Sequence, residues 1–198
     1  MSIGVAWIGE GPEPDRLMDA AVAALRREYA TGAVRLQYAD RPRQTYDATR
    51  RQHASRVMLA WLSEQLGARG PGGQGAGRPN VPDRLLGVTD VDLFIPVLTF
   101  VFGEAQLGGR AAVMSLARLA DAADSARLAS RAVKEAVHEL GHTFGLVHCP
   151  SAACVMSRSP GLTAVDLKGD RLCTDCRVRY RELTEHSHVT TESPHSDR

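Results

Sequence analysis

Two histidines and a glutamate lie close together between residues 138 and 142. On a helix of about 3.6 residues per turn, His138 and His142 lie one turn apart on the same side, so both imidazoles can reach one metal ion. Glu139 lies beside them, outside the line of the ligands, where its carboxylate can hold a metal-activated water and accept a proton from it. The spacing therefore predicts metal-assisted hydrolysis.

A third histidine follows at position 148. On an unbroken helix His148 would lie about 9 Å beyond His142, too far to share a zinc ion whose Zn–N bonds are about 2.1 Å long. Gly145 can end the helix in a left-handed conformation, so that His148 swings back as the third ligand. The fourth position is then left to a water, whose pKa a catalytic zinc lowers to about 7. The alternative is a chance pattern on an amphipathic helix, but the third histidine at this spacing favours zinc.

All four cysteines of the chain lie just after these histidines, as two close pairs. Four thiolates make a closed tetrahedral zinc site, which indicates a structural rather than a catalytic metal. Two disulfides or four free thiols are the alternatives, and a reducing compartment favours the metal. We therefore predict two Zn²⁺ per chain, one catalytic and one structural, with the structural zinc bound by Cys149, Cys154, Cys173 and Cys176.

Taken together, residues 138–176 resemble the archaemetzincin family of metzincin zinc peptidases. The resemblance lies in the extended zinc motif, the adjoining cysteine pairs and Met156, which by itself would indicate only ordinary packing. Residues 87–94 and 102–106 resemble the same family. One departure is that sixteen residues separate Met156 from Cys173, one fewer than in the family pattern.

The resemblance implies a role for each matched residue. It implies Glu139 as the general base, Met156 as the Met-turn residue beneath the catalytic site, and zinc ligands of two kinds. The catalytic-zinc ligands would be His138, His142 and His148, and the second-zinc ligands Cys149, Cys154, Cys173 and Cys176.

The fold implied is of the α/β class: a single compact metzincin-like domain with a mixed twisted β-sheet, an active-site helix beneath it and a four-cysteine zinc subsite. An edge strand would line the cleft. We take residues 111–116 as the candidate for that edge, with an ordinary core strand as the alternative.

The pattern of apolar residues predicts the elements that position these groups. Four-residue steps predict helices, and short apolar or alternating runs predict strands. The predicted helices cover residues 15–29, 53–66 and 125–144, and the predicted strands cover 3–8, 34–38, 88–95, 97–102 and 111–116. We expect the domain to span residues 1–184, with a flexible glycine-rich loop at 67–79 and a disordered tail at 185–198.

The charge balance says which partners to expect. Lys and Arg number 24 against 23 acidic residues, so no net field attracts nucleic acid or a membrane surface. Four arginines near the cysteines could instead form a nucleic-acid patch, although a solvated face is favoured; they are Arg171, Arg177, Arg179 and Arg181. Without a signal sequence or an apolar run of about 20 residues, we expect a cytoplasmic protein with neither membrane nor nucleic acid as a partner.

These features predict a zinc-dependent peptidase that acts on a peptide or protein substrate. Hydrolysis would use a zinc-activated water, with Glu139 as the general base. The alternative is a non-catalytic zinc protein that binds peptides or partners. Glu139 favours catalysis, because binding a metal does not require it.

Overall fold

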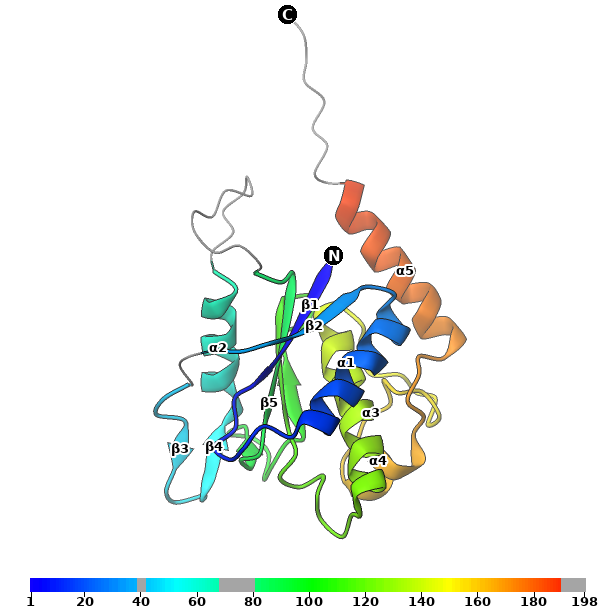
Figure 1. Ribbon diagram of the computed structural model, residues 1–198. Helices are drawn as coiled ribbons and strands as arrows, with labels where there is room; N and C mark the ends of the chain where they lie inside the picture. The colour runs from blue at the N-terminus through cyan, green and yellow to red at the C-terminus, as the bar shows by residue number, and fades with distance from the viewer. Residues whose placement is uncertain (39–41, 68–80, 190–198) are drawn as a thin grey trace, which may run out of the picture.

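The computed structural model describes residues 1–38, 42–67 and 81–189. Its centre is a mixed five-stranded sheet (Figure 1) in the order β2-β1-β5-β8-β7. The first four strands are parallel, and β7 runs antiparallel to β8. In this order the strands are β2 (Gly32–Leu36), β1 (Ser2–Trp7), β5 (Arg84–Thr89), β8 (Ala111–Ser115) and β7 (Gly103–Ala105).

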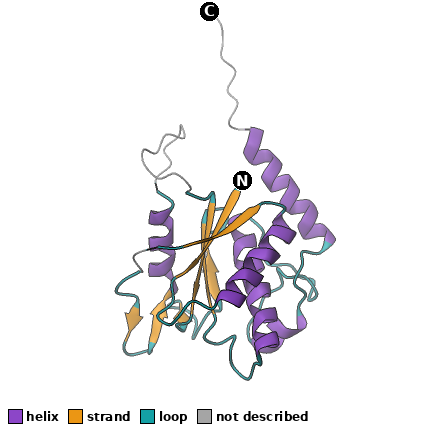
Figure 2. Ribbon diagram, in the orientation of Figure 1, coloured by secondary structure: helices purple, strands orange, loops and turns teal. Residues whose placement is uncertain are grey.

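Helices cover both faces of this sheet, which gives three layers (Figure 2). Helices α1 (Asp15–Tyr29) and α3 (Ser125–Thr143) cover one face, and α2 (Ser55–Gln65) covers the other. Because successive side chains of a strand point to opposite faces, Ile3 and Val5 join the core under α1 and α3, while Ala6 and Ile8 join the core under α2. The predicted α/β class with a mixed sheet is confirmed.

Three short strands form a second sheet, in the order β3-β4-β6. They are β3 (Tyr46–Asp47), β4 (Gln52–Ala54) and β6 (Leu93–Phe94). Since β4 ends where α2 begins, this sheet leads the chain directly into the helix.

The sequence predicted two central strands in 88–102, and this is wrong. The chain leaves β5 at Thr89, and the Asp90 carboxylate accepts hydrogen bonds from the backbone N–H groups of Glu10 and Gly11, which holds a bend there. Residues 97–102 form no strand of the sheet, and Val97 is 82% exposed. The apolar segments on either side of Pro96 predict two strands only if both segments are assumed to be buried in the sheet.

Residues 111–116 are not the edge strand. Strand β8 lies between β5 and β7, and all five of its residues are buried. The two edges are β2 and β7, and the residues of β7, Gly103, Glu104 and Ala105, are half-buried. A continuous apolar run is typical of a strand covered on both faces, and this is the core-strand alternative considered from the sequence.

Two helices complete the described chain, α4 (Leu162–Leu167) and α5 (Thr174–Val189). Helix α5 continues through 185–189, so the prediction of a disordered tail is wrong over those residues. Residues 190–198, and residues 68–79 of the predicted glycine-rich loop, lie outside the described residues. Among the residues that are described, no helix has the length and apolar character needed to cross a membrane.

Candidate metal centres

His138 and His142 lie on α3 with their rings facing each other. Their Nε2 atoms are 3.2 Å apart. The Nδ1 of His138 lies 2.8 Å from the carbonyl oxygen of Val155, and that of His142 lies 2.7 Å from the carbonyl oxygen of Leu146. Because a carbonyl oxygen can only accept a hydrogen bond, each Nδ1 must carry the proton. Each Nε2 is then left with a lone pair for a metal.

The chain turns after α3 and brings His148 back to this pair. Gly145 has φ +90°, a left-handed value, and the N–H of Leu146 donates to the carbonyl oxygen of Gly141. The ring centroid of His148 lies 5.3 Å from that of His138 and 4.9 Å from that of His142. One ligand atom from each histidine lies within 4.8 Å of the others. We call this group the histidine site.

All three imidazoles have pKa values below the ordinary value for histidine. Loss of hydration within the protein is the main cause for each, although His148 is the most exposed of the three, and for His138 the charge of Lys168 adds to it. The histidines are therefore neutral at neutral pH, which is the form that binds a metal. Three converging, neutral nitrogens with a proton-free Nε2 on two of them fit zinc.

Met156 packs directly beneath α3 at Gly141. A Cβ at Gly141 would come within 2.5 Å of the Met156 sulfur and within 2.8 Å of the Tyr29 hydroxyl. Only glycine permits this close approach. The contact lies one residue before His142, so it places Met156 next to the histidine site.

Glu139 lies against the edge strand, with only 5% of its surface exposed. A Cβ on Gly103 of β7 would come within 2.6 Å of the Glu139 carboxyl carbon. Burial raises the pKa of Glu139 well above its ordinary value, and Glu135 adds to the rise, while Lys168 opposes it. The positive charge of a bound metal would also oppose this rise.

The sequence analysis missed a buried ion pair beside these residues. Lys168 Nζ lies 2.8 Å from Glu135 Oε1, and their side chains are 0% and 2% exposed. Glu135 is one helical turn before Glu139 on α3, and Ser159, just after Met156, also donates to it at 3.4 Å. In a sequence, a lysine and a glutamate 33 positions apart look like ordinary surface charges.

The four cysteines converge as a second group, which we call the cysteine site. One sulfur from each lies within 4.8 Å of the others. The sulfurs of Cys149 and Cys173 are 3.8 Å apart, far beyond a disulfide bond length of about 2.05 Å, and all four thiols are free. The backbone N–H of Cys173 donates to the sulfur of Cys154 at 3.4 Å. Four sulfurs that converge without bonding fit a closed tetrahedral zinc site.

The arginines near the cysteines do not act alike. Arg177 donates to Glu28, whose carboxylate is fully buried, while Arg179 pairs with Glu182 on the surface of α5. Glu28 also accepts the backbone N–H of Leu172 at 2.9 Å. Arg177, near the start of α5, therefore holds the segment around Cys173 and Cys176 against α1.

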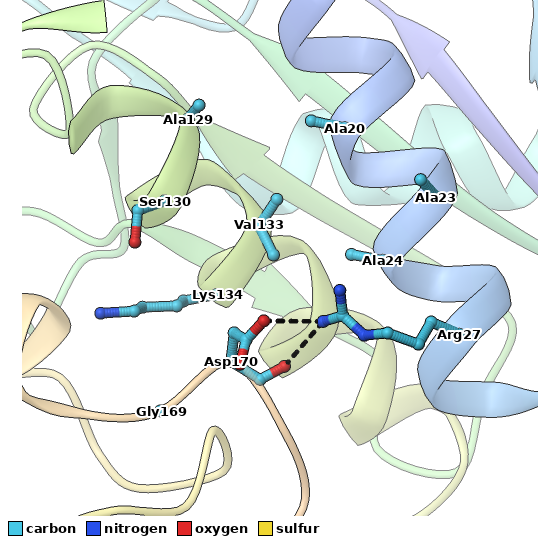
Figure 3. A pocket seen from close by; sticks show the side chains of 10 residues that line it. All are labelled: Ala20, Ala23, Ala24, Arg27, Ala129, Ser130, Val133, Lys134, Gly169 and Asp170. Carbon is cyan, nitrogen blue, oxygen red and sulfur yellow. Dashed lines mark hydrogen bonds and ion pairs between the residues drawn. The ribbon is translucent and has the colours of Figure 1, made fainter. Parts of the chain in front are cut away.

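A pocket of about 500 Å³ lies between α1 and α3 (Figure 3), but neither the histidines nor the cysteines line it. Small side chains such as Ala20, Ala24 and Ala129 form much of its wall. Its charged groups are engaged, since Arg27 pairs with Asp170 and Lys134 donates to backbone carbonyls of α4. The pocket thus offers no group for hydrolysis.

Known proteins resemble this chain over most of its length. Residues 82–182, which include both sites, match the family described as Peptidase family M54. The archaemetzincin of Methanopyrus kandleri is 40% identical over 172 residues, which cover 87% of this chain and 90% of that protein. The archaemetzincin of Archaeoglobus fulgidus is 41% identical over 138 residues, which cover 68% of this chain and 74% of that protein.

Two crystal structures extend the similarity to the fold. The archaemetzincin structure from Methanopyrus kandleri aligns with a TM-score of 0.79 at 35% identity, covering 93% of this chain and 96% of that one. The archaemetzincin structure from Archaeoglobus fulgidus aligns with a TM-score of 0.72 at 32% identity, covering 90% and 99%. The similarity therefore includes the sheet and helices as well as the metal-binding motifs.

Proposed function

The chain belongs to peptidase family M54 and is a zinc metallopeptidase, and from this premise we propose that it hydrolyses peptide bonds at the histidine site with Glu139 as the general base. The observation that carries the proposal is the convergence of three neutral imidazoles beside one buried carboxyl group. A bound zinc would supply a water activated near neutral pH and would polarise the carbonyl of the substrate.

Each histidine is held in the form that a ligand needs. The carbonyls of Val155 and Leu146 fix the tautomer and orientation of His138 and His142, so that their Nε2 atoms face one point. His148 completes the set from the turn at Gly145. Catalytic zinc would be bound by these three histidines, leaving one coordination position open for chemistry.

Glu139 supplies the proton transfer. Glu139 follows His138 on α3, and its carboxyl group packs against Gly103 of the edge strand β7. Burial raises the pKa of this carboxyl group, so it holds a proton more readily than an exposed glutamate does. The proposed role requires this, because the group must accept a proton from water and then pass it to the leaving amine.

The substrate, a peptide or protein, would lie along β7. In the described part of the chain this strand pairs only with β8, so its other edge presents unpaired backbone groups. An extended peptide can add to such an edge as a further strand. Because Gly103 of β7 abuts Glu139, a peptide bound there would pass close to the general base.

The cysteine site would hold the second zinc. Its four thiolates would fill all coordination positions and leave none for water or substrate, so this zinc would be structural. It would join two parts of the chain, since Cys149 and Cys154 precede α4 while Cys173 and Cys176 lie at the start of α5.

Zinc content tests the assignment of ligands. Elemental mass spectrometry of the freshly purified protein should give about two zinc ions per chain, falling to about one in His142→Ala. One zinc per chain that the substitution leaves unchanged would mean that only the cysteine site is filled, and the proposal would fail.

Activity tests the role of Glu139. In Glu139→Gln, kcat on a cleaved peptide from a library should fall by about 10²- to 10⁴-fold, while the zinc content stays at the wild-type value. Full zinc without cleavage in the wild type would instead support a non-catalytic protein that binds peptides.

A further inference from the structure

We propose that the cysteine site controls how tightly the histidine site binds zinc, through a backbone segment that the two sites share. The inference rests on the proposed function, because it takes both groups as zinc sites. The segment is 148–157, which begins with a histidine ligand, contains two of the cysteine ligands and ends just after Met156.

Val155 joins the two sites by its backbone. Its carbonyl oxygen accepts the Nδ1 proton of His138 at 2.8 Å, and its N–H donates to the carbonyl oxygen of Arg171 at 2.9 Å. Val155 follows Cys154, and Arg171 lies two residues before Cys173. The residue whose carbonyl orients a ligand of the histidine site is therefore adjacent to Cys154 in the chain and is hydrogen-bonded, through its N–H, to a residue two positions before Cys173.

The ends of the segment are also tied together. The N–H of Cys149 donates to the carbonyl oxygen of Met156 at 2.9 Å, and the N–H of Ser157 donates to the carbonyl oxygen of Cys154 at 2.9 Å. Cys149 thus sits between His148 and the Met156 backbone. A displacement of the Cys149 sulfur would move the backbone of the adjacent histidine.

His148 is the ligand most dependent on this arrangement. His138 is buried and His142 is half-buried on α3, whereas His148 is exposed and lies on no helix. Within the described residues, carbonyls hold the rings of His138 and His142, but no hydrogen bond holds the ring of His148. Its position is set mainly by the backbone, and the next residue along that backbone is Cys149.

A zinc in the cysteine site would fix this segment. Without a metal, the four sulfurs are joined only by weak sulfur hydrogen bonds such as that from the Cys173 N–H to Cys154. A zinc bound by all four cysteines would tie Cys149 and Cys154 to Cys173 and Cys176, and so would restrict the segment 148–157 that carries His148. Losing partners that orient ligands typically weakens metal binding by about 10- to 100-fold.

Co²⁺ is the probe, because four thiolates and three imidazoles give it different absorption spectra, so each site can be titrated separately. In the full chain with Cys173→Ser and Cys176→Ser, we expect Co²⁺ to bind the histidine site about 10- to 100-fold more weakly than in wild type, measured by chelator competition. The matched control is Tyr180→Phe, which removes the hydrogen bond from α5 to the Tyr29 carbonyl and leaves every thiol in place. It should keep wild-type affinity.

A reciprocal measurement covers the case in which the double cysteine variant does not fold. Coupling between two binding sites is mutual, so the cysteine site should bind Co²⁺ more weakly in His142→Ala, which cannot fill its histidine site, than in wild type whose histidine site is kept occupied, by a similar factor. Unchanged affinities in either experiment would overturn the coupling, although both sites would still bind metal and the proposed function would stand. A wild-type protein that shows no Co²⁺ spectrum from imidazole ligands would instead overturn the proposed function itself.

Discussion

The histidine site and the cysteine site differ in where their residues come from. Two of the three histidines lie on α3, a helix of 19 residues that packs against both α1 and the sheet. The cysteines come from a loop and from the start of α5, 24 positions apart from Cys149 to Cys173. The fold therefore places most of the histidine site on one helix, whereas we expect the cysteine site to depend more on its metal to hold its two parts together.

Removing all zinc should have the largest effect, and it should affect the region around the cysteines far more than α3. In the chelated protein, we expect backbone amides near the cysteines, 149–157 and 172–177, to lose hydrogen-exchange protection by at least about a thousandfold, because a structural zinc contributes on the order of 10 kcal/mol of apparent folding free energy. Amides of α3 should keep most of their protection, since the core holds that helix. Native-state hydrogen exchange read by mass spectrometry makes the measurement, and an equal loss in both regions would refute the comparison.

The buried ion pair between Lys168, directly after α4, and Glu135 of α3 should have the next largest effect on stability when it is broken. Lys168→Met leaves the buried Glu135 carboxylate without its charged partner, although Ser159 still donates to it, and should lower the free energy of unfolding by about 3–5 kcal/mol. Adding Glu135→Leu should recover most of the loss, because an apolar pair of similar volume is often as stable as a buried ion pair. Urea denaturation of the single and double variants gives both values.

A second ion pair on α3 is the control for this experiment. Arg131 pairs with Asp166, whose side chain is 38% exposed, and the buried Arg131 guanidinium also donates to the carbonyl oxygens of Leu119 and Asp121, so it keeps hydrogen-bond partners when Asp166 is changed. Asp166→Asn should therefore cost clearly less than Lys168→Met. Equal losses would mean that burial does not determine the cost of breaking these pairs.

The same contrast explains what the sequence could predict. The spacing of the apolar residues predicts the helix that carries His138 and His142, and this helix ends within one residue of the predicted position. The prediction succeeds because a four-residue step describes both the apolar face of a helix and two ligands that lie one turn apart. The convergence of His148 and of the cysteines followed from ligand chemistry and from the resemblance to a known family. Their roles as zinc ligands stay predictions.

What the sequence did not reveal depends on long-range packing. Residues 111–116 were the candidate for an edge strand, with a core strand as the alternative, yet they form the central strand β8, and the edge next to it is the short β7. The partnership of Lys168 with Glu135 was also invisible, since nothing local marks a lysine that will be fully buried. In both cases the missing information is which segments become neighbours, and periodicity does not carry it.

The contact between Met156 and α3 tests how closely the loop must fit the helix. In Gly141→Ala, the new Cβ would lie 2.5 Å from the Met156 sulfur, and relieving that overlap should cost about 1–3 kcal/mol of unfolding free energy. Gly161→Ala is the control, because a Cβ there meets no atom within 4 Å. Thermal denaturation of both variants makes the comparison. A Gly141→Ala protein as stable as the control would show that the segment around Met156 can move away from α3 without a loss of stability.

The smallest effect that we predict concerns the cost of burying Glu139. Its folded pKa is raised by burial, so the unfolded chain, with a glutamate pKa of about 4.3, loses this proton at lower pH than the folded chain does. Stability of the zinc-free protein therefore falls as pH rises above about 4.3 and until Glu139 ionises in the folded state. Glu139→Gln removes that loss, so it should raise the Tm of the chelated protein at neutral pH, by about 2–4 °C for each kcal/mol relieved, and not at pH about 4.

Thermal unfolding followed by circular dichroism across this pH range gives the Tm difference between wild type and variant, in chelator and in zinc. The zinc-loaded pair should show a smaller difference, because the charge of the ion favours the ionised carboxylate. A difference in Tm that does not change with pH would mean that the substitution acts through packing rather than through the charge. A difference that grows with pH only in chelator would show that the histidine site, although built by the fold, holds a group that costs stability until its metal binds.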